Sequence, residues 1–131
     1  MSESIFSQKR ILIVEDDFAN QKVATLFFKK LGCLTDIAEN GFQAVKKASD
    51  NVYDLIIMDC QMPLMDGMEA TEKIRENIGQ EIPIIAMTAN IDYKDRQSCF
   101  DAGMNDFVTK PINLQILTDV LEKWLTTNPI D

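Results

Sequence analysis

The chain contains no histidine among its 131 residues, and this absence removes several common chemistries. Serine–histidine and cysteine–histidine catalysis, histidine-ligated zinc and a phosphohistidine on this chain itself are all excluded. Cysteine is also scarce, and the three cysteines stand far apart without a C-x-x-C pair (Cys33, Cys60 and Cys99). We expect them to act as small buried hydrophobes in a reduced, cytoplasmic setting.

Long apolar runs and excess positive charge are absent too. No segment is apolar enough to cross a bilayer and none has a signal-peptide pattern, so we expect no membrane insertion. Lys and Arg number 13 against 21 Asp and Glu, which gives a net charge of −8. A phosphate backbone would be repelled, so direct nucleic-acid binding is not expected.

What the sequence does contain is an alternation of short apolar runs with amphipathic stretches. We expect five strands, near residues 11–14, 34–38, 54–59, 82–87 and 107–109. We expect five helices between and after them, near residues 23–31, 40–48, 66–79, 91–102 and 113–125. This alternation predicts an α/β fold with right-handed crossovers and a parallel sheet covered on both faces. The expected organisation is a flexible arm over 1–8, one domain over 9–127 and a tail over 128–131.

The stretch 54–63 carries the first chemical signal. Its apolar run ends abruptly at Asp59, and Pro63 follows four positions later. Such a run suits a strand buried on both faces, whose carboxyl end is where open α/β sheets bind ligands. We therefore expect Asp59 to be a nucleophile that receives a phosphoryl group. Strand alternation turns Cys60 away from the side of Asp59, so we expect it to pack rather than to serve redox chemistry.

The other predicted strands end in residues of complementary chemistry. Glu15 and Asp16 follow the first strand, Thr88 ends the fourth and Lys110 follows the fifth. Because the carboxyl ends of parallel strands meet at one edge, these side chains should converge on Asp59. Crowded carboxylates need a cation, and a small oxygen-rich site suits Mg²⁺. A hydroxyl and an ammonium are the groups that hold the oxygens of a transferring phosphoryl group.

These motifs together resemble the receiver domain of two-component response regulators, over about residues 9–125. The matching segments are Val14-Glu15-Asp16, Met58-Asp59, Met62-Pro63, Met65-Asp66-Gly67, Thr88-Ala89 and Thr109-Lys110-Pro111. The resemblance implies a flavodoxin-like, doubly wound sheet of five parallel strands in the order 2-1-3-4-5, with five helices. The chain is most similar in character to receivers of hybrid sensor histidine kinases, although Asn is more usual there at the position of Asp17.

The resemblance also implies a role in phosphorelay signalling. Asp59 would accept the phosphoryl group from a phosphohistidine on a sensor histidine kinase or a histidine phosphotransfer protein. Asp16, Asp59 and the backbone carbonyl of Gln61 would hold Mg²⁺, or Mn²⁺ in its place, and Glu15 would act through a metal-bound water. Thr88 would bind a phosphoryl oxygen.

Further implied roles concern the switch and the lifetime of the phosphoryl group. Lys110 would bind a second phosphoryl oxygen, before a cis bond to Pro111. Phe107 matches the aromatic switch position that responds to Thr88, and the surface over the fourth helix, fifth strand and fifth helix would change. Gln61, Ala89 and Asn90 would tune hydrolysis. The resemblance thus implies a self-catalysed phosphoacceptor rather than an enzyme, with a downstream target that the sequence does not name.

Three other interpretations compete with this one. A haloacid-dehalogenase-type phosphatase needs a second Asp two positions after the nucleophile, where Gln61 stands. A flavodoxin-like FMN protein needs a phosphate-cradling loop after the first strand, where this chain has acids. A degenerate receiver that serves mainly as an interaction module would lack a site residue, and none is missing. The sequence leaves open whether the receiver is a stand-alone regulator, a phosphorelay intermediate or a domain excised from a hybrid histidine kinase.

Overall fold

The computed structural model describes residues 6–60, 65–79, 81–89 and 93–125. Its strands are β1 (Arg10–Val14), β2 (Leu34–Ala38), β3 (Leu55–Asp59), β4 (Ile84–Thr88) and β5 (Asp106–Thr109). Its helices are α1 (Phe18–Lys30), α2 (Gly41–Asp50), α3 (Gly67–Asn77), α4 (Tyr93–Ala102) and α5 (Leu114–Leu125). The strands pair in parallel in the order β2-β1-β3-β4-β5. The predicted fold class, sheet order and number of helices are confirmed.

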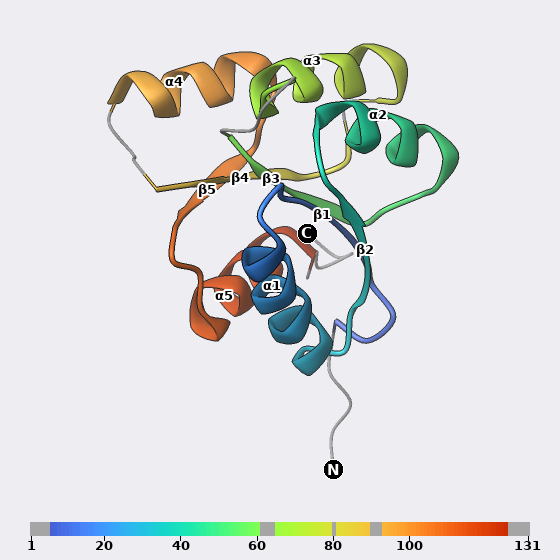
Figure 1. The fold of residues 1–131 in the computed structure, drawn as a ribbon, viewed down its shortest axis with the longest axis vertical. Helices are drawn as coiled ribbons and strands as arrows, with labels where there is room; N and C mark the ends of the chain where they lie inside the picture. The colour runs from blue at the N-terminus through green and yellow to red at the C-terminus, as the bar shows by residue number, and fades with distance from the viewer. Residues whose placement is uncertain (1–5, 61–64, 80, 90–92, 126–131) are drawn as a thin grey trace, which may run out of the picture.

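The sheet lies between two layers of helices, with α2, α3 and α4 on one face and α1 and α5 on the other (Figure 1). Successive side chains of a strand point to opposite faces, so each buried strand contributes to both layers. The upper core, under α2–α4, takes Leu12, Val14, Ile56, Met58, Ile84 and Ala86 from the strands. The lower core, over α1 and α5, takes Ile11, Ile13, Leu55, Ile57, Ile85, Met87 and Val108. Burial on both faces explains the continuous apolar runs of β1, β3 and β4.

Short polar residues begin four of the helices. The side chains of Asp17, Asn40, Asp66 and Asn113 each accept a hydrogen bond from the backbone N–H three residues further on. These bonds satisfy donors that the first turn of a helix leaves unpaired. They fix where each helix leaves the carboxyl edge of the sheet.

Some details differ from the expectations. Phe6, which we placed in a flexible arm, is buried in the lower core, because the turn at residues 6–8 returns the chain to the sheet, where the N–H of Gln8 donates to the carbonyl of Gly32. On α1, Ala24 and Phe28 provide the packing against the lower core, whereas Val23 is exposed. The remaining residues of the expected arm and tail lie outside the described residues, so the domain boundaries stay predictions.

Over the part of the chain that the structure describes, none of the helices has the length and apolar character needed to cross a bilayer.

Candidate functional site

Four strand ends bring the predicted side chains to one edge of the sheet. Glu15 and Asp16 directly follow β1, and Asp59 is the last residue of the neighbouring β3. Thr88 ends β4, and Lys110 follows β5. The N–H of Lys110 donates to the carbonyl of Thr88 over 2.8 Å, which ties the last two strands together at this edge. The predicted convergence of these five residues is therefore present in the structure.

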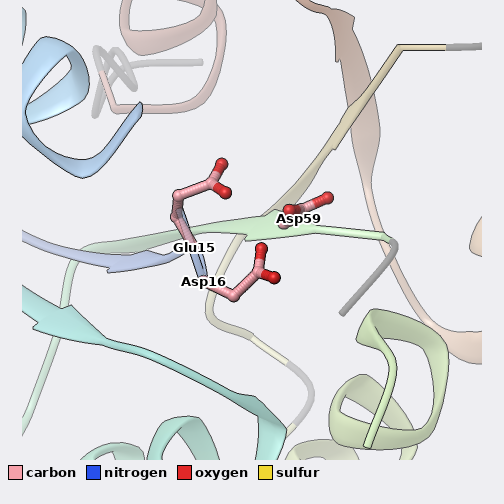
Figure 2. Close-up of side chains that lie close together, drawn as sticks. All are labelled: Glu15, Asp16 and Asp59. Atoms are coloured by element: carbon pink, nitrogen blue, oxygen red, sulfur yellow. The ribbon is translucent and has the colours of Figure 1, made fainter. Parts of the chain in front are cut away.

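Three carboxylates form the centre of the site. Figure 2 shows Glu15 and Asp16 reaching from the end of β1 and Asp59 from the end of β3. One oxygen of each lies within 4.8 Å of the others. Glu15 and Asp59 are only 1% and 4% exposed, whereas Asp16 faces solvent. Like charges this close destabilise one another unless a cation lies between them.

Lys110 supplies positive charge to two of these carboxylates. Its Nζ lies 3.0 Å from Oε1 of Glu15 and 3.2 Å from Oδ2 of Asp59. Burial alone would lower the pKa of this ammonium, but the two carboxylates outweigh burial, and the pKa of Lys110 is raised. The lysine therefore stays charged throughout the physiological pH range.

The pKa of Glu15 reflects its burial and the negative charge beside it. Burial, followed by the negative charge of Asp59, raises the pKa of its carboxyl against the opposing effects of the Asp17 N–H and Lys110. The side-chain amide of Gln21 on α1 donates to the backbone carbonyl of Glu15 over 2.7 Å. The Asp17 N–H donates to the carboxylate Oε2 of Glu15 over 3.1 Å. Helix α1 therefore holds the backbone of Glu15 in place beside the site.

Gly67 allows α3 to begin directly against Asp59. A Cβ at this position would lie 2.5 Å from the Asp59 carbonyl oxygen, a distance that no side chain tolerates. The Gly67 N–H donates to the Cys60 carbonyl over 3.2 Å. The absence of a side chain here thus lets α3 close over the end of β3. The sequence pattern signalled only a helix start at this glycine.

The residues expected to form the switch lie beside the site. Thr88 is buried at the end of β4, and Phe107 on β5 is half-buried against the upper core. The Phe107 ring meets Phe100 of α4 edge to face, with centroids 6.3 Å apart. The guanidinium carbon of Arg96 lies 5.5 Å from the Phe107 ring centroid. Sequence reasoning found Phe107 but missed Arg96 and Phe100, because α4 has a weakly patterned sequence.

The remaining predicted residues lie partly within the described residues and partly outside them. Ala89 is exposed just after β4, and the Lys110–Pro111 peptide bond is cis, as the resemblance implies. Gln61 and Asn90 lie outside the described residues. A groove of about 410 Å³ opens beside the site, lined by Glu15 and Lys110 and by apolar residues that include Val23.

The residues present fit a small, hard cation. The described donors are carboxylate oxygens, which suit Mg²⁺, and two of the three acids are buried where uncompensated charge is costly. The exposed Asp16 leaves the cluster open to water, and Mg²⁺ usually keeps several water ligands. The donor set therefore supports the predicted magnesium site.

Comparison with protein families gives a match over nearly the whole chain. The profile of the response regulator receiver domain matches residues 11–122, a span that runs from β1 to α5 and includes every predicted site residue.

The chain belongs to the response regulator receiver domain family.

Relatives of this receiver domain include parts of much larger kinases. Hybrid signal transduction histidine kinase B of Dictyostelium discoideum is 45% identical over 130 residues, covering 89% of this chain and 7% of that protein. Histidine kinase 5 of Arabidopsis thaliana is 36% identical over 146 residues, covering 91% of this chain and 16% of that protein. The chain thus spans a small fraction of the length of these relatives.

Solved structures agree with the receiver fold. The receiver domain of a sensor histidine kinase from Pseudomonas aeruginosa PAO1, with a magnesium ion coordinated in its active-site cleft, has a TM-score of 0.86 and 40% identity. The match covers 92% of this chain and 100% of the Pseudomonas receiver domain. The receiver domain of the response regulator Ssk1, in complex with the histidine phosphotransfer protein Ypd1 of Saccharomyces cerevisiae, has a TM-score of 0.84 and 31% identity. The match covers 92% of this chain and 90% of the Ssk1 receiver chain.

Proposed function

We propose that this receiver domain accepts a phosphoryl group on Asp59 from a phosphohistidine of a partner protein. The observation that carries the proposal is the contact between Asp59 and Lys110 inside a cluster of three carboxylates. An acidic cluster alone is common on protein surfaces. A buried carboxylate that shares one edge with an ammonium, a hydroxyl and two more acids has the parts that phosphoryl transfer uses.

In the proposed reaction, an oxygen of Asp59 attacks the phosphorus in line with the histidine nitrogen. The P–N bond breaks, the nitrogen keeps the electron pair and later takes a proton from solvent, and an acyl phosphate forms on Asp59. Lys110 and Thr88 hold the phosphoryl oxygens, where their hydrogen bonds strengthen as charge develops. The partner's histidine approaches through the groove that Glu15 and Lys110 line.

The metal roles follow the same assignment. Asp16, Asp59 and the backbone carbonyl of Gln61 would hold Mg²⁺, and Glu15 would contact one of its water ligands. When bound, Mg²⁺ neutralises charge on the transferring group, and Mn²⁺ would serve in its place. Gln61, Ala89 and Asn90 set the access of the hydrolytic water to the acyl phosphate. The domain is a phosphoacceptor that catalyses its own modification and dephosphorylation, not an enzyme that turns over a separate substrate.

Phosphorylation would be transmitted to the surface formed by α4, β5 and α5. The new group adds close to two negative charges next to Lys110 and Thr88. Phe107 would respond by turning inward, which changes its contacts with Arg96 and Phe100 of α4. A full shift between two states requires about 3–5.5 kcal/mol of differential stabilisation, a range that several charge-assisted hydrogen bonds reach. A downstream protein would bind the altered surface.

The expected setting follows from this function. We propose that the receiver unit extends over residues 9–127 and works in the cytoplasm, where sensor histidine kinases or histidine phosphotransfer proteins supply the phosphohistidine. The complex of a related receiver with a histidine phosphotransfer protein supports this class of partner.

Incubation with acetyl phosphate and Mg²⁺ tests the proposal without a cognate kinase. The intact mass should increase by one phosphoryl group, and chelation of Mg²⁺ should abolish the increase. Asp59→Asn should remain unmodified. A wild-type protein that gains no phosphate, or an Asp59→Asn variant that gains it stably, would contradict the assignment.

A further inference from the structure

Two cysteines that stand far apart in sequence meet beside the site. The sulfur atoms of Cys60 and Cys99 lie 3.3 Å apart, although 39 positions separate them in the chain. Cys60 directly follows Asp59 at the end of β3, and Cys99 lies on α4. Both belong to the upper core and are only 6% and 4% exposed. The contact therefore joins the strand of the phosphoacceptor to the helix that covers Phe107.

The backbone holds both cysteines in this position. The Cys60 N–H donates to the Met87 carbonyl over 3.0 Å, which continues the pairing of β3 with β4. The Cys99 carbonyl accepts from the Met104 N–H over 3.0 Å, in the turn that leads α4 into β5. These backbone hydrogen bonds tie Cys60 to β4 and Cys99 to the turn before β5.

The sequence predicted only a packing role for Cys60, but its contact with Cys99 points further. We propose that Cys60 and Cys99 form a redox modification site, which a peroxide converts into an intramolecular disulfide. One thiol reacts with hydrogen peroxide to give a sulfenic acid and one water. The second thiol attacks that sulfur, a second water leaves, and the S–S bond forms. The two thiols together lose two hydrogen atoms and two electrons, and one peroxide is reduced.

The geometry favours this step once an oxidant arrives. The sulfur atoms need to approach by little more than about 1 Å to reach the disulfide length of about 2.05 Å. A sulfenic acid formed at either position has its resolving thiol already in contact, which favours the disulfide over further oxidation. Because both thiols are buried, the oxidant must be small and uncharged, as hydrogen peroxide is.

Cys33 offers a matched comparison within the same chain. It is buried to a similar degree, but it packs in the lower core, across the sheet from the Cys60–Cys99 pair. Burial, with a smaller effect of Asp54, raises the pKa of its thiol to about 11. We expect Cys33 to remain reduced under conditions that close the disulfide.

The disulfide would affect signalling by fastening α4 to β3. This consequence rests on the proposed function, since it concerns the response of α4 to phosphorylation. Arg96 and Phe100 of α4 contact Phe107, so a rearrangement of Phe107 requires α4 to adjust. A covalent bond at Cys99 restrains that adjustment and disfavours the phosphorylated state. The steady-state phosphorylated fraction should therefore fall several-fold on oxidation and recover on reduction.

Peptide mapping of the oxidised wild-type protein tests the disulfide directly. The protein is treated with hydrogen peroxide, denatured, alkylated and digested. We expect a linked peptide pair that contains Cys60 and Cys99, an alkylated Cys33, and release of the pair by dithiothreitol. Alkylation of all three cysteines, or a disulfide that involves Cys33, would overturn the proposal.

The phosphorylation assay then tests the functional consequence. The phosphorylated fraction in acetyl phosphate and Mg²⁺ is measured before and after peroxide for wild type, Cys99→Ala and Cys33→Ala. Peroxide should lower the fraction in wild type and Cys33→Ala but not in Cys99→Ala. A disulfide that forms without lowering it overturns the coupling to α4. If reduced wild type gains no phosphate, the proposed function fails, while the peptide map still decides the redox site.

Discussion

The polar clusters at the two ends of the sheet differ in how their charges are balanced. At the carboxyl end, the described residues form a cluster of three carboxylates, two of which contact the ammonium of Lys110. The cluster near the amino ends of β1 and β3, which we call the amino-end cluster, contains Arg10, Asp36, Tyr53 and Asp54. There the Tyr53 hydroxyl donates to Asp36 over 2.7 Å, and Arg10 pairs with the same carboxylate over 3.3 Å.

The difference separates a structural cluster from a reactive one. In the amino-end cluster, Asp54 accepts from the Arg10 N–H over 2.7 Å and the guanidinium of Arg10 lies over the Tyr53 ring. Each charge there has a protein partner. The carboxyl end has an excess of negative charge, which only a bound cation or a change of protonation relieves. The amino-end cluster therefore stabilises the fold, whereas the carboxyl end keeps unbalanced negative charge that can bind a cation or react.

The largest effect should come from removing the ammonium at the carboxyl end. We expect Lys110→Ala to lower the rate of phosphate uptake from acetyl phosphate by about 100-fold, because one hydrogen-bond donor to the developing charge is lost. Lys110→Arg keeps the charge with a different geometry and should recover part of the rate. Initial rates from intact mass, at saturating Mg²⁺, give the comparison. Equal rates for wild type and Lys110→Ala would remove Lys110 from the mechanism.

The amino-end cluster should respond through stability alone. Asp36→Ala leaves the hydroxyl of Tyr53, a residue only 5% exposed, without its acceptor, at a cost of about 1–3 kcal/mol in unfolding free energy. Tyr53→Phe removes the hydroxyl as well, so adding it to Asp36→Ala should restore part of the loss. Urea unfolding of the four proteins measures this coupling. Phosphate uptake should stay at the wild-type rate, and a large drop would show that the two ends are not independent.

Magnesium should stabilise one end of the sheet and leave the other unaffected. A ligand that binds the folded state at ten times its Kd raises the unfolding free energy by about 1.4 kcal/mol. We expect this increase in wild type and in Asp36→Ala but not in Asp16→Asn, which loses an oxygen of the proposed metal site. Urea midpoints with and without Mg²⁺ test it, with Ca²⁺-free buffers and matched ionic strength. An undiminished increase in Asp16→Asn would contradict the role of Asp16.

A smaller, pH-dependent effect is expected at the amino end of β5. Burial alone would raise the pKa of Asp106, but hydrogen bonds from Trp124, the Phe107 N–H and Lys123 outweigh it, and the pKa is lowered. A lowered folded-state pKa adds stability that is present above the unfolded pKa of about 3.9 and is lost as the pH falls through the folded value. We expect Asp106→Asn to lower the unfolding free energy by about 1 kcal/mol at pH 7.

That difference between Asp106→Asn and wild type should begin to shrink below about pH 4, where the unfolded chain takes up a proton, and should disappear only once the pH falls below the lowered folded-state pKa of Asp106. Unfolding free energies from pH 3 to 7 measure it. A difference that stays constant over this range would show that Asp106 acts through packing rather than through its charge.

The sequence predicted the fold and the centre of the site for the same physical reason. Short apolar runs between amphipathic stretches define a parallel sheet, and such a sheet brings Glu15, Asp59 and Lys110 to one edge wherever they lie in the chain. Parallel pairing of the strands thus brings residues that are far apart in the sequence together in one site. The order of the strands and the individual roles came from the resemblance to receiver domains.

Contacts that depend on side-chain packing were not predictable in this way. Helix α4 has no clear apolar stripe, so nothing in the sequence placed Cys99 against Cys60 or Phe100 against Phe107. Phe6 lies in a polar, unpatterned segment, and its burial depends on the turn that follows it. These contacts are set by the tertiary structure, which periodicity along a single element does not report.

Chemical trapping of the modified residue tests the central claim most directly. The protein is treated with acetyl phosphate and Mg²⁺ and then reduced with borohydride, which converts an aspartyl phosphate into homoserine. Digestion and mass spectrometry locate the altered position. We expect homoserine at position 59, and none when Mg²⁺ is chelated. Homoserine at position 16, or phosphate retained on a serine or threonine while Asp59 is unchanged, would contradict the account.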